Sequence, residues 1–550
     1  MKKFITSALP YVNNQPHLGN IIGSVLSGDV YSRYCKKKGE VSVYICGTDE
    51  YGTAIEMEAI SQGVTPLEIC EKNRKLHKQV YDWFNIDFDY FGFTSSATHT
   101  GLVQDLFMKM YDNGHFSEVE IEQFYCEHCG LFLADRFIVG ECKFCGDGRA
   151  RGDQCDSCGH TYNSLELLSP RCSICSSSPV VRATTHLFFD LEAFRPSLEE
   201  LYRTNGHLWS QNAQNIFRQW ISMEFYPRCM TRDLKFNWGV PVPLEKFKEK
   251  VFYVWFDAPI GYLTFLKELV GEDFGEWCKD AELVQFMGKD NVAFHTVIFP
   301  AMLYATGEKY PVVRRLSATE YLQFENEKFS KSRRHGIFGL DLVGGGLGKS
   351  CMWRYYLLKI RPESTKDSNF TFSDFRQSVT ADLINNLGNF VNRVLKYIQS
   401  KCNSRVSLLE LDSGDKKCIE DVNELYCKYK AKMEEIKLRE ALQVVMEICR
   451  RGNEYIQEGV RSRDRKGHFF CLGFSIIGLV GTLLHPFIPV TSLEILRMCN
   501  LEETMFPESM RIVDGHTMGS DIRPLFEDFT TEQIEEMKRY DRPQSTGCSK

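Results

Sequence analysis

The stretch that decides the fold lies near the start of the chain and reads SALPYVNNQPHLGN at residues 7–20. It follows an apolar segment at residues 4–6 that is typical of a strand, and residues 21–34 after it have the apolar spacing of a helix. A helix start offers unpaired N–H groups and a positive dipole end, His17 can donate to a phosphate oxygen, and Gly19 lets a ligand approach the backbone closely. A packed histidine beside a turn is the alternative, and this stretch alone does not decide between the two.

Length and composition limit the kind of protein. At 550 residues the chain is long enough for roughly three or four domains, each with its own core. Its apolar fraction of 43% is that of a soluble globular protein. The net charge of -7 excludes a protein that coats nucleic acid through bulk positive charge, so any nucleic-acid contact must be local.

Three further features bear on the compartment. The first residues carry two lysines but no unbroken apolar core after them, so we expect no export signal. The longest apolar run, at 469–484, is interrupted by glycines and short for a membrane span, and fits a core helix better. Of the 21 cysteines, the thirteen that lie outside Cys-x-x-Cys pairs are scattered singly. Scattered cysteines without secretion indicate free thiols in a reducing compartment, and we expect a cytoplasmic protein.

Strand and helix patterns alternate in the first part of the chain, up to about residue 93. A short apolar run at 41–46 leads into GTDE at 47–50, and Pro66 opens a helical stretch. Alternation of this kind predicts a parallel sheet covered by helices, whose ligands bind at the carboxyl ends of the strands. His17 and Asp49 would both lie at such ends.

The composition changes abruptly at residues 126–179. This segment is dense in Cys, Gly, Asp and Ser and has no helical period, which predicts a small inserted domain. The alternating pattern returns with VFYVW at 251–255 and LVQFMG at 283–288. We therefore expect one sheet that is interrupted by the insert and then resumed.

Helical patterns dominate after about residue 371 and predict a helix bundle. The helical stretches lie at 379–398, 420–436, 439–455 and 468–484. The loops between them are polar, as at 403–417, and the tail at 542–550 is predicted to be disordered.

Metal-ligating residues are concentrated in the insert. Four Cys-x-x-Cys pairs fall there: Cys126 and Cys129, Cys142 and Cys145, Cys155 and Cys158, Cys172 and Cys175. Two thiolates at this spacing can hold two corners of a tetrahedral zinc site, so we expect two closed, structural zinc sites. The middle pairs are near enough in sequence to form one knuckle, which would leave the outer pairs to meet each other. The functional alternative is a nucleic-acid-binding ribbon, although nearby basic residues such as Arg136 are offset by acidic ones.

A second candidate for phosphate binding is KFSKSRR at 328–334, with four positive charges in seven positions. Charge runs are usually solvated loops, but serines alternating with lysines also suit a loop that closes over phosphates. GGGLGKS at 344–350 looks like a phosphate-binding P-loop. That motif requires a glycine five residues before Gly348, where Val343 stands, so we predict an ordinary loop before a helix.

Taken together, HLGN at 17–20 and KFSKS at 328–332 resemble the two signature motifs of class I aminoacyl-tRNA synthetases. The order of the two motifs, the cysteine-rich insert between them and the helical C-terminal part make the combination specific. Other segments resemble the methionyl-tRNA synthetase family, in its eukaryotic and archaeal form: LPY at 9–11, GTD at 47–49, VWFDAPIGY at 254–262, MGKD at 287–290 and FH at 294–295. The resemblance extends to about residue 528.

This resemblance implies an α/β protein with a Rossmann-type parallel-sheet catalytic domain, a zinc-knuckle insertion in it, and an all-α anticodon-binding helix bundle after it. The implied divisions are the first half of the catalytic domain at 1–115, the inserted connective domain at 116–230, the second half of the catalytic domain at 231–315, the lysine-loop region that contacts the tRNA stem at 316–372, and the anticodon-binding domain with its disordered tail at 373–550.

The implied reaction joins methionine to ATP, supplied with Mg²⁺, and transfers the methionyl group to the terminal adenosine of tRNA(Met). Methionine would be bound by Leu9, Tyr11, Asp49 (its ammonium group), Trp255, Ala258, Pro259, Tyr262, Phe294 and His295. ATP would be bound by His17, Asn20, Gly288, Asp290 and Lys331, and the catalytic residues would be His17, Asn20, Lys328, Lys331 and Arg232. The anticodon would be read by Asn389 and Arg393.

These roles make chemical sense. Attack of a carboxylate on the α-phosphate needs no covalent help from the protein, so catalysis consists of positioning and charge stabilisation. A thioether is soft and polarisable, which suits aromatic walls. For each aromatic residue taken singly, ordinary core packing is the alternative.

The chain departs from the bacterial pattern at three places. Asn20 replaces the second histidine of the first motif, and Phe329 replaces the methionine of the second. The Pro-Trp that the family places after NEYI at 453–456 is replaced near Arg461, so this segment lacks the family's tryptophan as a stacking platform for an anticodon base. Basic residues at 461–466 could contact phosphates instead.

Two rival functions remain. Leucyl, isoleucyl and valyl enzymes carry a much larger editing insert, and cysteinyl enzymes use zinc in the amino-acid pocket, whereas all the paired cysteines here lie in the insert. A non-catalytic tRNA-binding protein on the same fold is the second rival, and the presence of His17, Asp49 and Lys331 argues against it. We further expect a monomer.

Overall fold

The core of the protein, in a computed structural model, is a five-stranded parallel sheet. The structure describes residues 2–133, 135–152, 155, 157–158, 160, 162–329, 335–344, 346–460 and 465–541. The order of the strands is β14-β13-β1-β2-β3, with bounds β1 Lys3–Ser7, β2 Ser42–Thr48, β3 Tyr90–Phe93, β13 Glu282–Gly288 and β14 Val313–Thr319. Every neighbouring pair is parallel. Strands from both sides of the insert thus join one sheet, which confirms the prediction of an interrupted and resumed sheet.

Strand β1 occupies the centre of this sheet, between β13 and β2, and all five of its residues are buried. A strand covered on both faces shows no polar alternation, and its buried polar residues have partners: Lys3 donates to Glu282 at 3.0 Å and the Ser7 hydroxyl to the Ser24 carbonyl at 3.0 Å. The helix after it begins at Leu18 and runs to Lys37 without a break, as α1 Leu18–Asn20, the π-helical η1 Ile21–Val25 and α2 Leu26–Lys37. The predicted order of strand, loop and helix is confirmed.

The segment VFYVW at 251–255 does not join the parallel sheet, so its prediction as a strand of that sheet was wrong. β12 Val251–Phe252 pairs antiparallel with β11 Thr231–Arg232, and the chain then enters α8 Val254–Asp257. A short run of apolar residues identifies burial, and does not by itself separate a strand from a buried helical turn.

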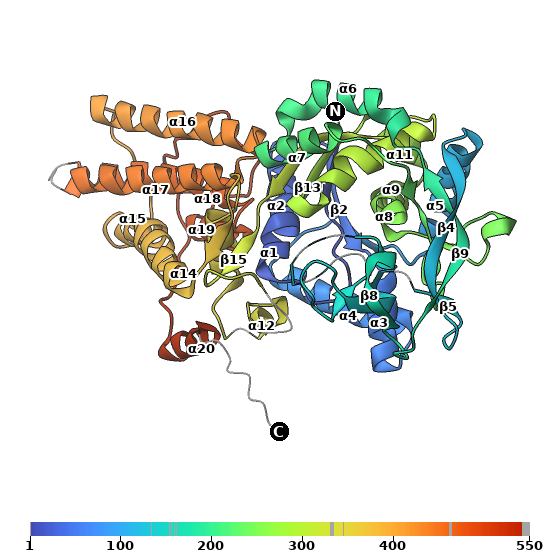
Figure 1. Ribbon diagram of the computed structural model, residues 1–550. Helices are drawn as coiled ribbons and strands as arrows, with labels where there is room; N and C mark the ends of the chain where they lie inside the picture. Colours follow the sequence, from blue (N-terminus) through green and yellow to red (C-terminus); the bar gives the residue numbers. More distant parts are fainter. Residues whose placement is uncertain are drawn as a thin grey trace.

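The insert is framed by two long antiparallel strands, β4 Phe116–Cys126 and β9 Val180–Phe189, which pair over ten residues. The cysteine-rich loops and the short strands β6 Ile138–Glu141, β7 Ala150–Arg151 and β8 Leu168–Cys172 lie between them. In Figure 1 the β4–β9 pair stands at one end of the molecule, the helix bundle stands at the other, and the parallel sheet lies between them.

After β16 Ser368–Phe370, the described part of the chain contains helices and no further strands. They are α14 Phe372–Ser378, η11 Val379–Gly388, α15 Asn389–Lys401, α16 Ser413–Glu434, α17 Leu438–Val460, α18 Lys466–Leu484, α19 Pro489–Cys499 and α20 Thr531–Asp541. The four predicted helical stretches are confirmed. Helix α16 starts inside the predicted polar loop because the Asp412 side chain accepts the Asp415 N–H and caps it. The predicted disordered tail, 542–550, lies outside the described residues.

Among the described residues, one helix is long and apolar enough to cross a membrane, α18. In this structure 83% of its apolar window is buried inside the protein. That burial is typical of the central helix of a bundle, as predicted for this run.

Candidate active site

A cavity of about 730 Å³ opens at the carboxyl ends of the parallel strands. Many of the predicted site residues line it: Leu9, Tyr11, His17, Asn20, Asp49, Arg232, Trp255, Ala258, Pro259, Tyr262, Gly288, Asp290 and His295. They come from loops that follow three different strands and from the segment after the insert. The fold therefore brings together residues that lie far apart in the sequence.

The first-motif histidine caps its own helix. The Nδ1 atom of His17 accepts the Gly19 N–H at 3.1 Å, while the Asn20 side-chain oxygen accepts the His17 N–H at 3.1 Å. A Cβ atom at Gly19 would lie 2.9 Å from the His17 ring, so glycine permits this arrangement. Burial lowers the pKa of His17 to about 4. The ring is therefore neutral near pH 7 and carries its proton on Nε2, because Nδ1 is an acceptor.

Asp49 follows β2 and is held against the first-motif loop. Its backbone N–H donates to the Pro10 carbonyl at 3.0 Å, and its carbonyl accepts from Val12 at 3.1 Å. The carboxylate is buried, and its Oδ1 atom has no hydrogen-bond partner among the described residues. Burial, with Asp257 as a second and smaller cause, raises the pKa of Asp49 well above its usual range. Such a carboxylate is poised for a cationic ligand.

Aromatic side chains form one side of the cavity. Trp255 stacks on Phe294 with ring centroids 3.6 Å apart and an interplanar angle of 9°. Phe294 thus supports Trp255 from behind and is not itself among the residues that line the cavity.

A buried Tyr–His pair lies beside these rings. His295 Nδ1 donates to the Asn291 carbonyl at 2.7 Å, which leaves its Nε2 to accept the Tyr262 hydroxyl at 2.9 Å. Burial lowers the pKa of His295 to about 4, so this side of the cavity is uncharged.

A polar side of the cavity lies at the ends of β13 and β14. The Tyr321 hydroxyl donates to Asp290 at 2.5 Å, and Lys328 and Lys289 lie over the Tyr321 ring at 5.6 and 4.1 Å from its centroid. The Tyr321 side chain thus contacts Lys328 with its ring and Asp290 with its hydroxyl. Lys331, the other predicted lysine, lies outside the described residues.

Arg232 lies at the edge of the same cavity. Its guanidinium lies 3.9 Å from the centroid of the Tyr253 ring and donates to the Thr231 carbonyl at 3.0 Å. These contacts hold a positive charge at the cavity wall.

Sequence reasoning did not single out two residues that line the cavity as part of this site. Tyr321 follows β14, whose carboxyl end is where such a residue is expected, but that strand was not identified from the sequence. Arg136, from the insert, also lines the cavity. The sequence identified it only as one basic residue near the cysteines.

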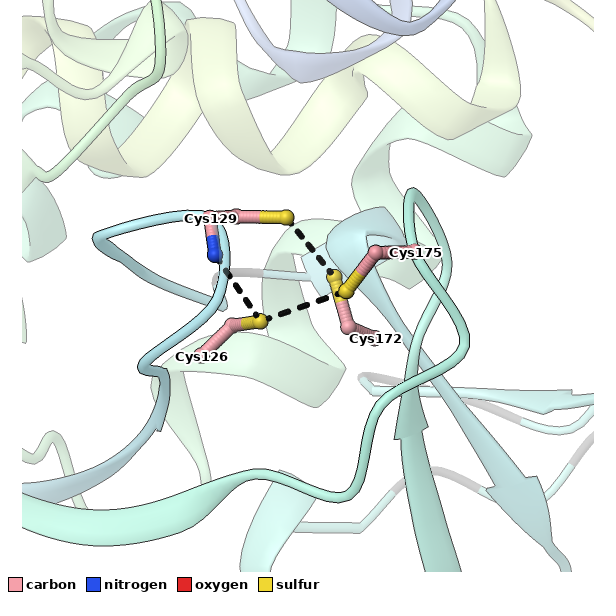
Figure 2. A group of neighbouring side chains, drawn as sticks. All are labelled: Cys126, Cys129, Cys172 and Cys175. Atoms are coloured by element: carbon pink, nitrogen blue, oxygen red, sulfur yellow. Dashed lines mark hydrogen bonds between the residues drawn. The ribbon is translucent and has the colours of Figure 1, made fainter.

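The eight paired cysteines form two clusters. Cys126, Cys129, Cys172 and Cys175 make one, and Cys142, Cys145, Cys155 and Cys158 make the other, with all four sulfurs of each cluster within 4.8 Å of one another. Figure 2 shows the first cluster, in which two separate loops present their sulfurs to a common centre. The middle pairs thus form one cluster and the outer pairs the other, as the spacing indicated. Either cluster could hold a metal ion.

Asn389 and Arg393 lie far from this cavity in sequence, on α15. Both line a surface groove of about 440 Å³ together with residues of α17. Arg393 donates to Gln457 across the groove at 3.4 Å. Of the basic residues predicted at 461–466 as phosphate contacts, the structure describes Arg465 and Lys466. Arg465 is paired with Asp412 and Asp415, and Lys466 lies over the Tyr397 ring at 5.8 Å from its centroid.

Comparison with known proteins gives independent evidence on the family of the chain. Residues 3–395 match the family model of the class I tRNA synthetases (M), and residues 410–541 match that of the anticodon binding domain of methionyl tRNA ligase. A probable cytoplasmic methionine–tRNA ligase of Vairimorpha ceranae is 54% identical, covering 98% of this chain and 99% of that protein. One from Dictyostelium discoideum is 47% identical over 97% of this chain and 74% of its own length.

A solved structure shares the fold. The methionyl-tRNA synthetase of Mycobacterium tuberculosis in complex with methionyl-adenylate superimposes with a TM-score of 0.78 at 21% identity, over 96% of this chain and 99% of that one. The family models and the relatives together assign the sequence to one family. The chain belongs to the class I tRNA synthetases, in the methionine–tRNA ligase family.

Proposed function

We propose that this chain activates methionine with ATP and transfers the methionyl group to tRNA(Met). The observation that carries this proposal is that one cavity holds both Asp49 and His17. Asp49 is a buried carboxylate whose Oδ1 has no hydrogen-bond partner in the described part of the chain, and His17 is a neutral histidine at a helix start. The first suits an ammonium group, and the second suits a phosphate.

Methionine binds with its ammonium group on Asp49 and its side chain among the neutral aromatic walls. Tyr262 and His295 satisfy each other by a hydrogen bond, so neither demands a polar partner from the ligand. Trp255, backed by Phe294, offers a flat polarisable surface for a thioether. Leu9, Tyr11, Ala258 and Pro259 complete this pocket.

ATP, supplied with Mg²⁺, binds along the other side. His17 donates from Nε2 to a phosphate oxygen, and Asn20 lies beside it at the helix start. Gly288 and Asp290 receive the ribose at the end of β13, where the Tyr321 hydroxyl orients the Asp290 carboxylate. Arg232, Lys328 and Lys331 supply positive charge for the departing pyrophosphate.

The reaction then needs only alignment and charge. A carboxylate oxygen of methionine attacks the α-phosphorus, the bond to the bridging oxygen breaks, and pyrophosphate leaves with that electron pair. In the second step a ribose hydroxyl of the terminal adenosine attacks the carbonyl carbon, the bond from that carbon to the phosphate oxygen breaks, and AMP leaves with that electron pair while the hydroxyl proton passes to the leaving phosphate. Fixed donors on the phosphates stabilise charge as it develops.

Both cysteine clusters fit zinc. Zinc–thiolate bonds of about 2.3 Å place the sulfurs of a tetrahedron about 3.8 Å apart. The structure has 3.5 Å between Cys126 and Cys175 and 3.9 Å between Cys129 and Cys172. Four thiolates leave no open position, so the role of both ions is structural.

The groove with Asn389 and Arg393 receives the anticodon. Asparagine and arginine side chains, which offer hydrogen-bond donors in a fixed geometry, suit the edges of splayed bases. The enzyme works as a monomer in the cytoplasm, the compartment named for its relatives. The twenty cysteines that the structure describes form no disulfide, which is consistent with that compartment.

The test is exchange of labelled pyrophosphate into ATP, measured with each amino acid in turn. Methionine should support exchange, and the Asp49→Asn variant should lose most of it at low methionine concentration. Exchange with another amino acid would assign a different synthetase. No exchange with any amino acid would favour a non-catalytic tRNA-binding protein.

A further inference from the structure

Phe329, the residue that departs from the bacterial pattern of the second motif, lies against the first motif. Its ring stacks on His17 with centroids 4.6 Å apart and an interplanar angle of 11°. Phe338 contacts the same imidazole only by its edge, at 6.5 Å and 84°. His17 is therefore covered on one face by an aromatic ring from the start of the lysine-rich segment.

The stack restrains a part of His17 that the backbone leaves free. The hydrogen bond from Gly19 to Nδ1 fixes one edge of the imidazole, but a single contact allows the ring to tilt about it. A flat ring lying parallel to the imidazole opposes that tilt. With both contacts in place, the Nε2 edge is held in one direction.

Phe329 is itself fixed by its surroundings. It packs against Phe324 at 5.8 Å and belongs to the edge of the large hydrophobic core. Gly336 has a φ of +125°, and a Cβ atom there would lie 2.3 Å from the Phe329 ring. No side chain at 336 is compatible with the present position of the ring.

The chain beyond the lysine-rich segment is attached to the first motif as well. The Gly339 N–H donates to the Pro16 carbonyl at 2.8 Å, and the Leu340 N–H donates to the Gln15 side chain at 3.3 Å. Phe329 on one side and residues 339–340 on the other thus hold the two signature motifs together. If Phe329 only filled the core, its ring would have no need to stack on the His17 imidazole.

We propose that Phe329 is a positioning residue for the activation step, whose ring holds the His17 imidazole in the orientation that receives the ATP phosphates. This inference rests on the proposed function. It predicts that loss of the flat ring slows chemistry without weakening methionine binding, because Phe329 does not line the methionine side of the cavity. If Phe329 served only the core, its replacement would lower the stability of the fold and would not slow adenylate formation selectively relative to methionine binding.

The first experiment compares Phe329→Leu with Phe338→Leu, a matched variant whose ring meets His17 only by its edge. Phe329→Leu should lower the single-turnover rate of adenylate formation by roughly 10–100-fold, as expected for a misplaced catalytic group, with the KM for methionine within about twofold of the parent. Phe338→Leu should have a much smaller effect. Equal rates for the parent and Phe329→Leu, or equal losses in the two variants, would overturn the proposal.

The second experiment reads the stack directly by NMR of histidine-labelled protein, with His17 assigned by its absence in His17→Gln. The ring current of Phe329 should shift the His17 Cε1 proton, and Phe329→Leu should abolish that shift. If the His17 resonance is the same in the parent and in Phe329→Leu, the proposal for Phe329 is wrong, whatever the exchange assay shows. If exchange fails with every amino acid, it is the proposed function that is wrong. If Phe329→Leu does not fold, Gly336→Ala, which must displace the ring, should show the same loss of shift and rate.

Discussion

Asp49 is a carboxylate in a place where a carboxylate is costly. It is 8% exposed, and its Oδ1 atom lacks a hydrogen-bond partner within the described residues. Its raised pKa means that in the free protein it stays protonated at pH values where a surface aspartate is ionised. An ammonium ligand binds the ionised form and lowers that pKa. Ligand binding and proton release are therefore coupled.

This coupling gives a prediction for methionine binding. Methionine should release a proton on binding, and its affinity should rise with pH through the raised pKa of Asp49, until the ammonium group itself loses its proton. Calorimetry in two buffers of different ionisation enthalpy measures the release. Asp49→Asn should abolish it and weaken binding by roughly 10–100-fold, the range for a hydrogen bond to a charged group. The same binding enthalpy in both buffers would contradict the prediction.

Tyr321 gives a second prediction at this scale. Tyr321→Phe removes the hydroxyl that binds Asp290 at 2.5 Å but keeps the ring that Lys328 faces. The KM for ATP should rise about tenfold while the KM for methionine stays unchanged, because one hydrogen bond to a charged group is lost. Tyr226→Phe, which removes a similar bond to Glu224 at the surface, is the control and should change neither. A rise in both constants would mean that the ring, and not the hydroxyl, had been disturbed.

Single elements show how far the sequence could predict this fold. The alternation of strands and helices, the closeness of His17 and Asp49, and the pairing of the cysteines all follow from spacing. The π-helical segments do not. Segment η1 directly follows Asn20, η10 Phe294–Ile298 contains His295, and η11 directly precedes Asn389. An apolar period identifies the buried face of a helix, but one wider turn in it leaves the same pattern.

The contact between Tyr321 and Asp290 was unpredictable for another reason. It joins the ends of two neighbouring strands, and it depends on where β14 stops and on the direction of one side chain. Neither is written in a short apolar run. The same limit applies to residues 251–255, where burial was predicted correctly and the type of element was not.

The cysteine clusters give a prediction for one element, the insert. The parent protein should contain about two zinc ions per chain, since two sets of four thiolates are present. Replacing the buried pair Cys126 and Cys172 by serine, or the buried pair Cys142 and Cys155, should each remove one ion in elemental analysis. Next to Cys172, the Ser173 hydroxyl donates to the Met57 sulfur at 4.0 Å. Met57 belongs to α3 Thr53–Gln62, which begins four residues after Asp49.

The two double variants should therefore differ in activity. Loss of the Cys126 and Cys172 site should lower methionine-dependent exchange strongly. Loss of the Cys142 and Cys155 site, whose cluster includes the exposed Cys145, should lower it less. A parent with a single ion, or equal losses of exchange in the two variants, would contradict this division.

At the scale of the whole molecule, the catalytic sheet and the helix bundle share one hydrophobic core. A single buried cluster contains Ile5 of β1 and Leu483 of α18. Helix α13 Ser350–Lys359 crosses this junction and carries Arg354, which is 1% exposed. Arg354 donates to Asp29 at 2.6 Å, to the Phe487 carbonyl at 2.6 Å and to the Phe84 carbonyl at 2.8 Å. One guanidinium thus joins the catalytic helices to the bundle.

Two activities can separate the role of this junction from that of the catalytic site. On the proposed function, pyrophosphate exchange needs the cavity alone, whereas charging of tRNA would need the cavity and the groove of α15 at a fixed separation. Arg354→Met leaves Asp29 and the two carbonyls with fewer partners, and breaking a buried pair of this kind costs about 3–5 kcal/mol of unfolding free energy. Arg33 still pairs with Asp29 at 3.0 Å, so we expect folded protein with a lower thermal midpoint.

In Arg354→Met, below that midpoint, the rate of tRNA charging should fall more than the rate of exchange, since the junction fixes the groove relative to the cavity. Arg393→Ala is the matched control. It removes an arginine of the groove and should weaken charging by about 1–3 kcal/mol, without changing the thermal midpoint or exchange. If Arg354→Met lowers exchange and charging by the same factor, the junction supports only the stability of the catalytic domain. If it lowers neither, the shared core alone holds the two parts in place.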